Sequence, residues 1–169
     1  MVQDGFSEYA EARWRTLVRS AVLLGCDLHE AEDLAQATLL RCYVKWAQVE
    51  RAADRDAYVA RILVNLHRQS RRRRWWREQP TQVLPEEAVG DRTGDVDGTE
   101  TVRLALAGLS VEHREVVLLR VHLQLSERQT ADALRIAPGT VKSRLSRALA
   151  RLAGDPDLID LHGQTRGEP

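Results

Sequence analysis

Apolar residues recur at intervals of three and four along most of the chain, with few breakers between them. This spacing is the period of an α-helix, and no stretch alternates between apolar and polar residues as a half-buried strand does. The pattern predicts three long helices and then four shorter ones, over about residues 9–25, 27–46, 56–76, 102–109, 111–123, 127–134 and 138–152. The predicted fold class is therefore all-α.

The helical pattern stops where the sequence from Glu78 reads EQPTQVLPEEAVGDRTGDVDGTE. This stretch is rich in Pro, Gly, Thr and acidic residues, and it has too little apolar surface to offset the entropy lost on ordering. We expect a flexible acidic linker over 78–101 that joins two small helical domains at 6–77 and 102–153. The last residues, 154–169, are expected to form a frayed tail.

Charge is segregated along the chain. Lys and Arg number 25, and Asp and Glu also number 25, so the formal net charge is zero. Residues 51–77 and 102–153 are nevertheless basic, and the linker between them is acidic. Solubility does not require such segregation, so the positions of the charges point to an anionic partner.

The last two predicted helices have the spacing of a helix-turn-helix motif. Ser126 and Gln129 can form a capping box at the start of the first helix. Pro138 suits the first position of the second, because its missing N–H would have no partner there. The short connection between the two helices completes the motif, which therefore predicts a DNA-binding unit.

The second of these helices has two opposed faces when it is drawn at about 100° per residue. Apolar residues that would hold it to its domain form one face: Val141, Leu145, Ala148, Leu149 and Leu152. Residues suited to DNA form the other: Lys142, Ser143, Ser146 and Arg147. Small hydroxyls allow close approach to a groove, while Lys and Arg reach phosphates or guanine edges. A solvated basic face is the alternative.

A second basic stripe follows the helix predicted at 56–76. It consists of Arg61, Asn65, Arg68 and Arg72, with apolar residues on the far side. The run RRRRWWR ends this helix, and arginines this dense are expected to contact phosphates because they repel one another without an anionic partner. Trp75 and Trp76 are expected to anchor the end of the helix in the core, and stacking on bases is the alternative.

No residue pattern indicates catalysis, a cofactor or a membrane segment. Cys26 and His29 have the spacing of half a zinc site, but no second pair of ligands follows. The sequence has no Gly-rich phosphate loop and no Ser/His/Asp set at useful spacing. Its N-terminus does not resemble a signal peptide, and no apolar run approaches the roughly 20 residues that span a bilayer. We therefore expect a cytoplasmic protein that is not an enzyme, binds no metal or cofactor and does not insert into a membrane.

Four stretches resemble one family, in family order: HEAEDLAQATLLRCYVKW, YVARILVNLHRQSRRRR, REVVLLRVHLQLSERQTADAL and PGTVKSRLSRALARL. The family is the extracytoplasmic-function (ECF) sigma factors, the small two-domain promoter-specificity subunits of bacterial RNA polymerase. The resemblance implies that 6–77 is sigma region 2 and that 102–153 is sigma region 4. It also implies that the chain is nucleoid-associated when bound to polymerase.

The resemblance implies contacts with the β and β′ subunits of core polymerase. The helix containing AEDLAQ docks on a coiled coil of β′ in the family, which implicates Asp33, Gln36 and Arg41. Apolar residues of REVVLLRVHL would meet the β flap. An anti-sigma factor is a further candidate partner.

The resemblance also implies promoter DNA as a partner. Segment 48–55, QVERAADR, would help to capture a flipped base of the minus-10 element. Residues implied to contact the minus-10 element are Arg61, Asn65, Arg68, Arg71 and Arg72. Residues implied to contact the minus-35 element are Arg120, Pro138, Thr140, Lys142, Ser143, Ser146 and Arg147.

One departure from the family and one alternative function accompany this interpretation. Ala137 stands where the family often has a Ser or Asp that caps the recognition helix, so the side-chain cap is missing. The alternative is a stand-alone helix-turn-helix regulator that binds palindromic DNA as a dimer. The sequence offers no heptad seam, ligand pocket or phosphoacceptor domain to support that alternative.

Overall fold

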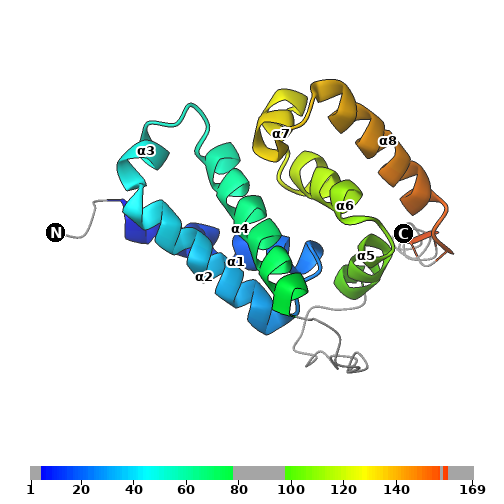
Figure 1. The fold of residues 1–169 in the computed structure, drawn as a ribbon, viewed down its shortest axis with the longest axis horizontal. Helices are drawn as coiled ribbons and strands as arrows, with labels where there is room; N and C mark the ends of the chain where they lie inside the picture. The colour runs from blue at the N-terminus through cyan, green and yellow to red at the C-terminus, as the bar shows by residue number, and fades with distance from the viewer. Residues whose placement is uncertain (1–4, 78–97, 157, 160–169) are drawn as a thin grey trace, which may run out of the picture. The chain divides into compact units, whose positions relative to one another are not determined.

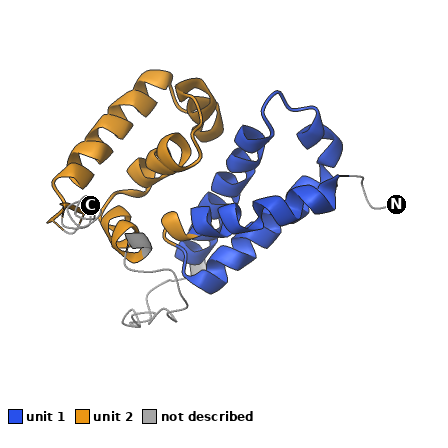
Figure 2. Cartoon of the chain, turned by 180° about the vertical axis from the view of Figure 1, so that it is seen from behind, with its two compact units in different colours: residues 1–21, 26–91 blue, residues 22–25, 92–169 orange. Residues whose placement is uncertain are grey.

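A computed structural model of the chain describes residues 5–77, 98–156 and 158–159. Every regular element in these ranges is a helix (Figure 1), so the prediction of an all-α protein is confirmed. Internal contacts divide the chain into two compact units (Figure 2): residues 1–21 with 26–91, and residues 22–25 with 92–169. Residues 78–97, which make up most of the expected linker, and 160–169 of the expected tail lie outside the described residues.

The first unit is built from long helices and the second from shorter ones. The helices of the first are α1 (Phe6–Leu23), α2 (Leu28–Val44), α3 (Trp46–Glu50) and α4 (Arg55–Arg77). Those of the second are α5 (Gly98–Ala107), α6 (Val111–Val117), the π-helical turn η1 (Leu118–His122), α7 (Glu127–Leu134) and α8 (Pro138–Ala153).

Two boundaries differ from those expected from the pattern. The helix predicted over 27–46 ends at Val44, because Lys45 leaves helical backbone angles (φ −112°, ψ 23°) and Trp46 begins the separate helix α3. Helix α5 begins at Gly98, although residues 98–101 were expected to belong to the linker. Glu100 and Arg103 support this first turn through two hydrogen bonds between their side chains, of 2.7 and 2.8 Å.

The buried strip of α2 consists mostly of small side chains. Its fully buried members are Ala31, Ala35, Thr38 and Cys42. The Thr38 hydroxyl donates a hydrogen bond of 2.7 Å to the Leu34 carbonyl, so the hydroxyl is satisfied within the core. Helix α2 packs against α4, where Leu63 is also fully buried. Small side chains of this kind allow helices to approach closely.

One carboxylate joins the start of α2 to the end of α4. Asp27 and Glu30 form a capping box, in which the Glu30 amide donates to Asp27 Oδ1 (2.8 Å) and the Asp27 amide donates to Glu30 Oε2 (3.2 Å). Arg74, near the end of α4, donates from Nη2 to the other oxygen of the same carboxylate, Glu30 Oε1. Glu30 therefore both closes the first turn of α2 and holds the last turns of α4.

The second unit contains the predicted helix-turn-helix. Ser126 and Gln129 form the predicted capping box at the start of α7, with hydrogen bonds of 2.7 and 3.2 Å. Arg135 ends α7 in the left-handed conformation (φ 57°, ψ 49°), and α8 begins at Pro138. The packing of α8 against α6 and α7 completes the motif, which confirms the prediction.

A single arginine fixes the connection between α5 and α6. The Arg114 guanidinium donates to the carbonyl groups of Leu106 (3.0 Å), Ala107 (3.1 Å) and Leu109 (3.2 Å). These carbonyls lie at or just beyond the end of α5, where helical partners run out. Arg114, which belongs to α6, thus supplies hydrogen bonds to the carbonyl groups at the end of α5.

We predict that Ser126→Ala lowers the free energy of unfolding of the second unit by about 1 kcal/mol, because the Gln129 amide loses its acceptor at the helix start. Urea titration followed by circular dichroism measures the change. Ser146→Ala is the matched control, since Ser146 is exposed within α8 and caps no helix. Equal destabilisation by the two substitutions would contradict the assigned role of Ser126.

Candidate functional site

The face of α8 that carries Lys142, Ser146 and Arg147 is exposed, as the sequence predicts. Ser143 is half-buried, and its hydroxyl donates to the Thr140 carbonyl at 3.1 Å. Val141 lies on the opposite side and is fully buried. The helix therefore presents a compact face of cations and small hydroxyls to its surroundings.

The apolar stripe of α8 is narrower than the sequence predicts. Val141 and Ala148 are fully buried, but Leu149 is 43% exposed, and Leu145 and Leu152 are half-buried. On a helical wheel Leu149 lies about 90° from the direction shared by Val141 and Ala148. The placement of Leu149 in the core was therefore wrong, because α6 and α7 cover only a narrow strip of α8.

The start of α8 has no side-chain cap, as expected from Ala137. Pro138 is exposed there and Thr140 is half-buried. Arg120 lies on the separate turn η1, where its Nη1 donates to the Leu125 carbonyl. Arg120 thus braces the segment that leads into α7, a role that sequence reasoning did not identify.

Helix α4 presents the second basic face. Arg61, Arg71 and Arg72 are exposed, and Asn65 and Arg68 are half-buried. The Arg61 guanidinium lies 5.0 Å from the centre of the Tyr58 ring, a cation–π contact. The implied base-capturing segment 48–55 begins in α3 and ends at the start of α4. One helix thus brings together all five residues expected at the minus-10 element.

Trp75 and Trp76 do not anchor the end of α4 in the core. Their side chains are 72% and 73% exposed, and the two rings meet edge to face with centroids 5.5 Å apart. The expectation of core anchoring was wrong. Taking Arg61 as zero, the two indoles fall at about −40° and +60°, on either side of the arginine stripe, and they extend beyond the part of α4 that the core of the unit covers.

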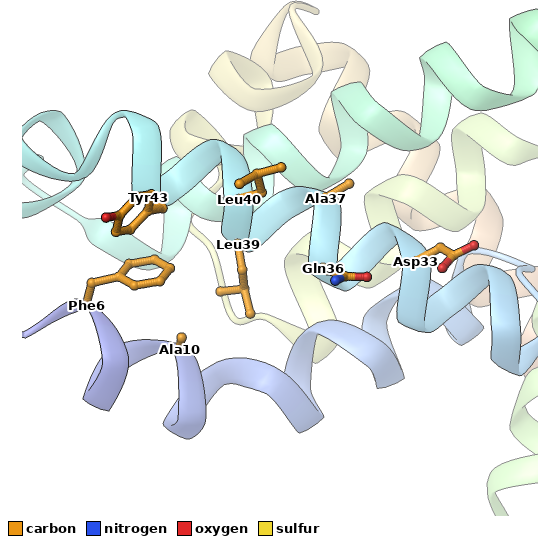
Figure 3. Close-up of a pocket in the computed structure, with 8 residues that line it drawn as sticks. All are labelled: Phe6, Ala10, Asp33, Gln36, Ala37, Leu39, Leu40 and Tyr43. Atoms are coloured by element: carbon orange, nitrogen blue, oxygen red, sulfur yellow. The ribbon is translucent and has the colours of Figure 1, made fainter. Parts of the chain in front are cut away.

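A groove of about 520 Å³ lies between α1 and α2 (Figure 3). Its lining includes Asp33 and Gln36, together with apolar side chains from both helices: Phe6, Ala10, Ala37, Leu39, Leu40 and Tyr43. Arg41 is exposed but does not line it, since it lies about 80° around α2 from Asp33. The structure therefore brings together two of the three expected polymerase-binding residues.

Sequence reasoning missed the apolar part of this surface. Leu40 and Val44 are 64% and 70% exposed. Both lie within about 20° of the direction of Asp33 on the helical wheel. The signal was present, because residues 37, 40 and 44 form a second apolar line on a helix whose buried line already runs through 31, 34, 38 and 42. An amphipathic helix needs only one such line for its own core.

The two cysteines, possible metal ligands and possible membrane-spanning helices were also considered in the sequence. Burial raises the pKa of the Cys42 thiol to about 11, and Cys26 is half-buried. No group of three or more His, Cys, Asp or Glu residues in the described ranges could hold a metal ion. In the same part of the chain, no helix is both long enough and apolar enough to cross a membrane.

Comparisons with known proteins match both units. The family profile of Sigma-70 region 2 matches residues 6–77, and that of Sigma-70 region 4 matches residues 99–152. The RNA polymerase sigma-E factor of Streptomyces coelicolor is 40% identical over 152 residues, which cover 87% of this chain and 83% of the relative. The ECF RNA polymerase sigma factor SigL of Mycobacterium tuberculosis is 34% identical over 155 residues, which cover 87% and 84%.

Solved structures agree with this assignment. The sigma factor RpoE from Bartonella quintana, solved in complex with the anti-sigma factor NepR, matches with a TM-score of 0.73 and 27% identity, over 89% of this chain and 95% of that one. CnrH, solved in complex with the cytosolic domain of CnrY, shares the fold, with a TM-score of 0.60 and 22% identity over 92% and 88%. This chain belongs to the ECF sigma factors, which direct RNA polymerase to promoters.

Proposed function

We propose that this sigma factor reads the minus-35 element with α8 and the minus-10 element with α4, and that it binds core polymerase through the groove on α2. The observation that carries the proposal is that each unit exposes one basic helix face opposite a buried strip. Basic faces on two separate units suit a promoter with two separate elements. The protein would supply binding, and the polymerase would supply catalysis.

On α8, Lys142, Ser143, Ser146 and Arg147 would meet base edges and phosphates of the minus-35 element. Pro138 and Thr140 lie at the helix start, where the Thr140 amide donates to the Ala137 carbonyl (2.9 Å) and the Gly139 amide between them would donate to a phosphate. Arg120 would add a phosphate contact. A guanidinium has five N–H donors, so Arg120 can hold the Leu125 carbonyl and a phosphate together.

On α4, the exposed guanidinium groups of Arg61, Arg71 and Arg72 would contact phosphates of the minus-10 element. Asn65 lies on the same face, and its amide can pair with adenine through one donor and one acceptor. Arg68 lies between these residues on the helical wheel. The five side chains would therefore follow one DNA strand along about three turns of helix.

On α2, the groove would hold a helix of the polymerase β′ coiled coil. A helix that docks in a groove uses apolar anchors, which Leu40 and Tyr43 can contact. Asp33 and Gln36 would add polar specificity, and Arg41 would contribute from outside the groove. The exposed apolar line of α2 supports this assignment, because single exposed leucines are common but a continuous line is not.

The domain roles follow from these assignments. Residues 6–77 would act as region 2, residues 102–153 as region 4, residues 78–101 as the acidic linker and residues 154–169 as a tail. Each DNA-binding face is small, and joining two weak sites through a linker raises the effective concentration of the second once the first is bound. This arrangement favours a polymerase-bound factor over the stand-alone palindrome-binding regulator.

A protein with these partners would work in the cytoplasm and associate with the nucleoid when bound to polymerase. An anti-sigma factor is a further proposed partner, by analogy with the Bartonella quintana relative solved in such a complex. The groove on α2 is the surface that such a protein would need to cover to keep the factor from polymerase.

We predict that Lys142→Ala lowers promoter use about tenfold without weakening polymerase binding, because a good contact to a base edge is worth ~1–3 kcal/mol. Arg147→Ala should act in the same direction. Run-off transcription with core polymerase measures the effect, on a promoter selected by the complex from a random-sequence library. Tight binding of the free protein to palindromic DNA would contradict the proposed function.

The matched control on α8 is Arg151→Ala. Arg151 is exposed on the same helix, about 180° from Lys142, so the same loss of charge falls on the other side. Promoter use should stay near that of the unmodified protein. If Lys142→Ala and Arg151→Ala reduce transcription equally, the effect comes from total charge and not from the proposed face.

We predict that Asp33→Ala or Leu40→Ala weakens binding to core polymerase about tenfold, because each removes a contact in the groove on α2. Pull-down with core polymerase measures the loss, and circular dichroism checks the fold. Glu32→Ala is the control, since Glu32 is an adjacent exposed acid that does not line the groove. An equal loss with Glu32→Ala would show that only helix charge matters.

A further inference from the structure

Arg135 lies in the turn between α7 and α8 (Figure 1), in a conformation that L-residues rarely adopt. Its backbone is left-handed, with φ 57° and ψ 49°. The amides of Arg135 and Ile136 both donate to the Ala131 carbonyl, the second at 3.1 Å, so backbone groups at the end of α7 close the turn. None of these hydrogen bonds needs the arginine side chain.

Glycine is the residue that suits the backbone at this position. In the left-handed conformation the Cβ of an L-residue comes too close to the following carbonyl oxygen, and glycine avoids that clash because it has no Cβ. Helices therefore commonly end in a left-handed glycine. The turn would be more stable with glycine than with arginine, so the geometry of the turn does not explain the side chain.

The described part of the fold does not use the Arg135 side chain either. Arg135 is exposed, and its guanidinium forms no hydrogen bond or ion pair with another described residue. Gln124 also has a positive φ of 57°, but its side-chain amide donates to the Val121 carbonyl at 3.1 Å and so supports its own turn. Arg135 instead keeps all five N–H donors of its guanidinium for a different partner.

The place of Arg135 in the motif indicates the chemistry of that partner. Pro138, the first residue of α8, follows only three positions later, so the two Cα atoms are at most about 11 Å apart. DNA carries one phosphate per ~3.4 Å along each strand. A strand that reaches Gly139 and Lys142 therefore brings further phosphates past the turn. A guanidinium matches a phosphate well, because it can donate two parallel hydrogen bonds to it.

We propose that Arg135 binds a backbone phosphate beside the minus-35 element, so that the turn adds a contact to those of α8. This inference rests on the proposed DNA-binding role of α8. Phosphate contacts position a protein on the duplex but carry no sequence information. Arg135 therefore raises the affinity for promoters without changing which sequence is read. The strained backbone lowers the stability of the turn in exchange for this contact.

The test measures binding of a labelled promoter fragment by the complex of this factor with core polymerase, using fluorescence anisotropy at several salt concentrations. Arg135→Gly and Arg135→Asn remove the charge and tolerate a left-handed backbone. Each should make the slope of log affinity against log salt shallower by ~0.9, the value for one phosphate. At ~0.15 M salt this slope corresponds to about fivefold weaker binding. Arg135→Lys should keep most of the slope, because the positive charge remains.

Three controls separate a phosphate contact from other roles. Arg135→Gly should raise the urea midpoint of unfolding while it weakens DNA binding, whereas loss of a residue that only supports the fold would lower both. Arg151→Ala removes an exposed charge from the other side of α8 and should leave the salt slope unchanged. On a promoter with a scrambled minus-35 sequence, Arg135→Gly should weaken binding by the same factor, because every sequence has the same phosphates.

Three results would overturn the proposal: an unchanged salt slope in Arg135→Gly, a lower urea midpoint in that variant, or weaker binding of that variant to core polymerase without DNA. The proposed minus-35 role of α8 is tested separately by Lys142→Ala in run-off transcription. If Lys142→Ala lowers promoter use while the Arg135 variants keep the full slope, only the contact in the turn is lost. If the Arg135 variants lose slope while Lys142→Ala has no effect, the role of Lys142 fails and the phosphate contact stands.

Discussion

The packing of α2 against α4 determines where the candidate interfaces of the first unit lie. The buried strip of α2 is built from small side chains such as Ala31, Ala35 and Thr38, which allow a close approach. The line of Asp33 and Leu40 lies on the opposite side of α2 from this strip, so burying the strip leaves that line facing outward. The buried strip of α4 likewise leaves Arg61, Arg71 and Arg72 exposed, with Arg68 half-buried. A larger residue at Ala35 would separate the helices and disturb both faces together.

Ion pairs in this unit hold the ends of α4 in place but add little to the free energy of folding. Exposed salt bridges contribute only ~0–1 kcal/mol, so the pair formed by Arg74 and Glu30 adds little to the free energy of folding. It does remove one arginine from a run of four and fix the helix end. The pair formed by Arg13 and Asp56 similarly joins α1 to the first turn of α4. Both ends of α4 are thus tied to neighbouring helices, and its basic face is held between them.

Periodicity was sufficient to predict the helices and the helix-turn-helix, because both depend on local capping and on one buried strip per helix. It could not predict how much of each strip the neighbours cover. Leu149 and Trp76 were therefore placed in the core, although both are exposed. The same limit hid the apolar line through Leu40, since exposure depends on tertiary packing that no local pattern encodes. The early start of α5 at Gly98 is supported by the Glu100–Arg103 side-chain pair, which composition alone does not reveal.

The two helices of the helix-turn-helix begin in opposite ways, and the difference matches their proposed roles. In the capping box of α7 the Ser126 and Gln129 amides each donate to the other residue's side chain, so that helix gains stability from its own side chains. Ala137 offers α8 no side-chain acceptor, which costs the second unit about 1 kcal/mol relative to a capped start. Since the amides of Thr140 and Val141 donate to the Ala137 carbonyl, the Gly139 N–H is the group that would meet an anion at the positive end of the helix dipole. An Asp at this position would cap the helix but repel phosphate, so the stability lost at Ala137 leaves an N-terminus that a DNA phosphate can complete.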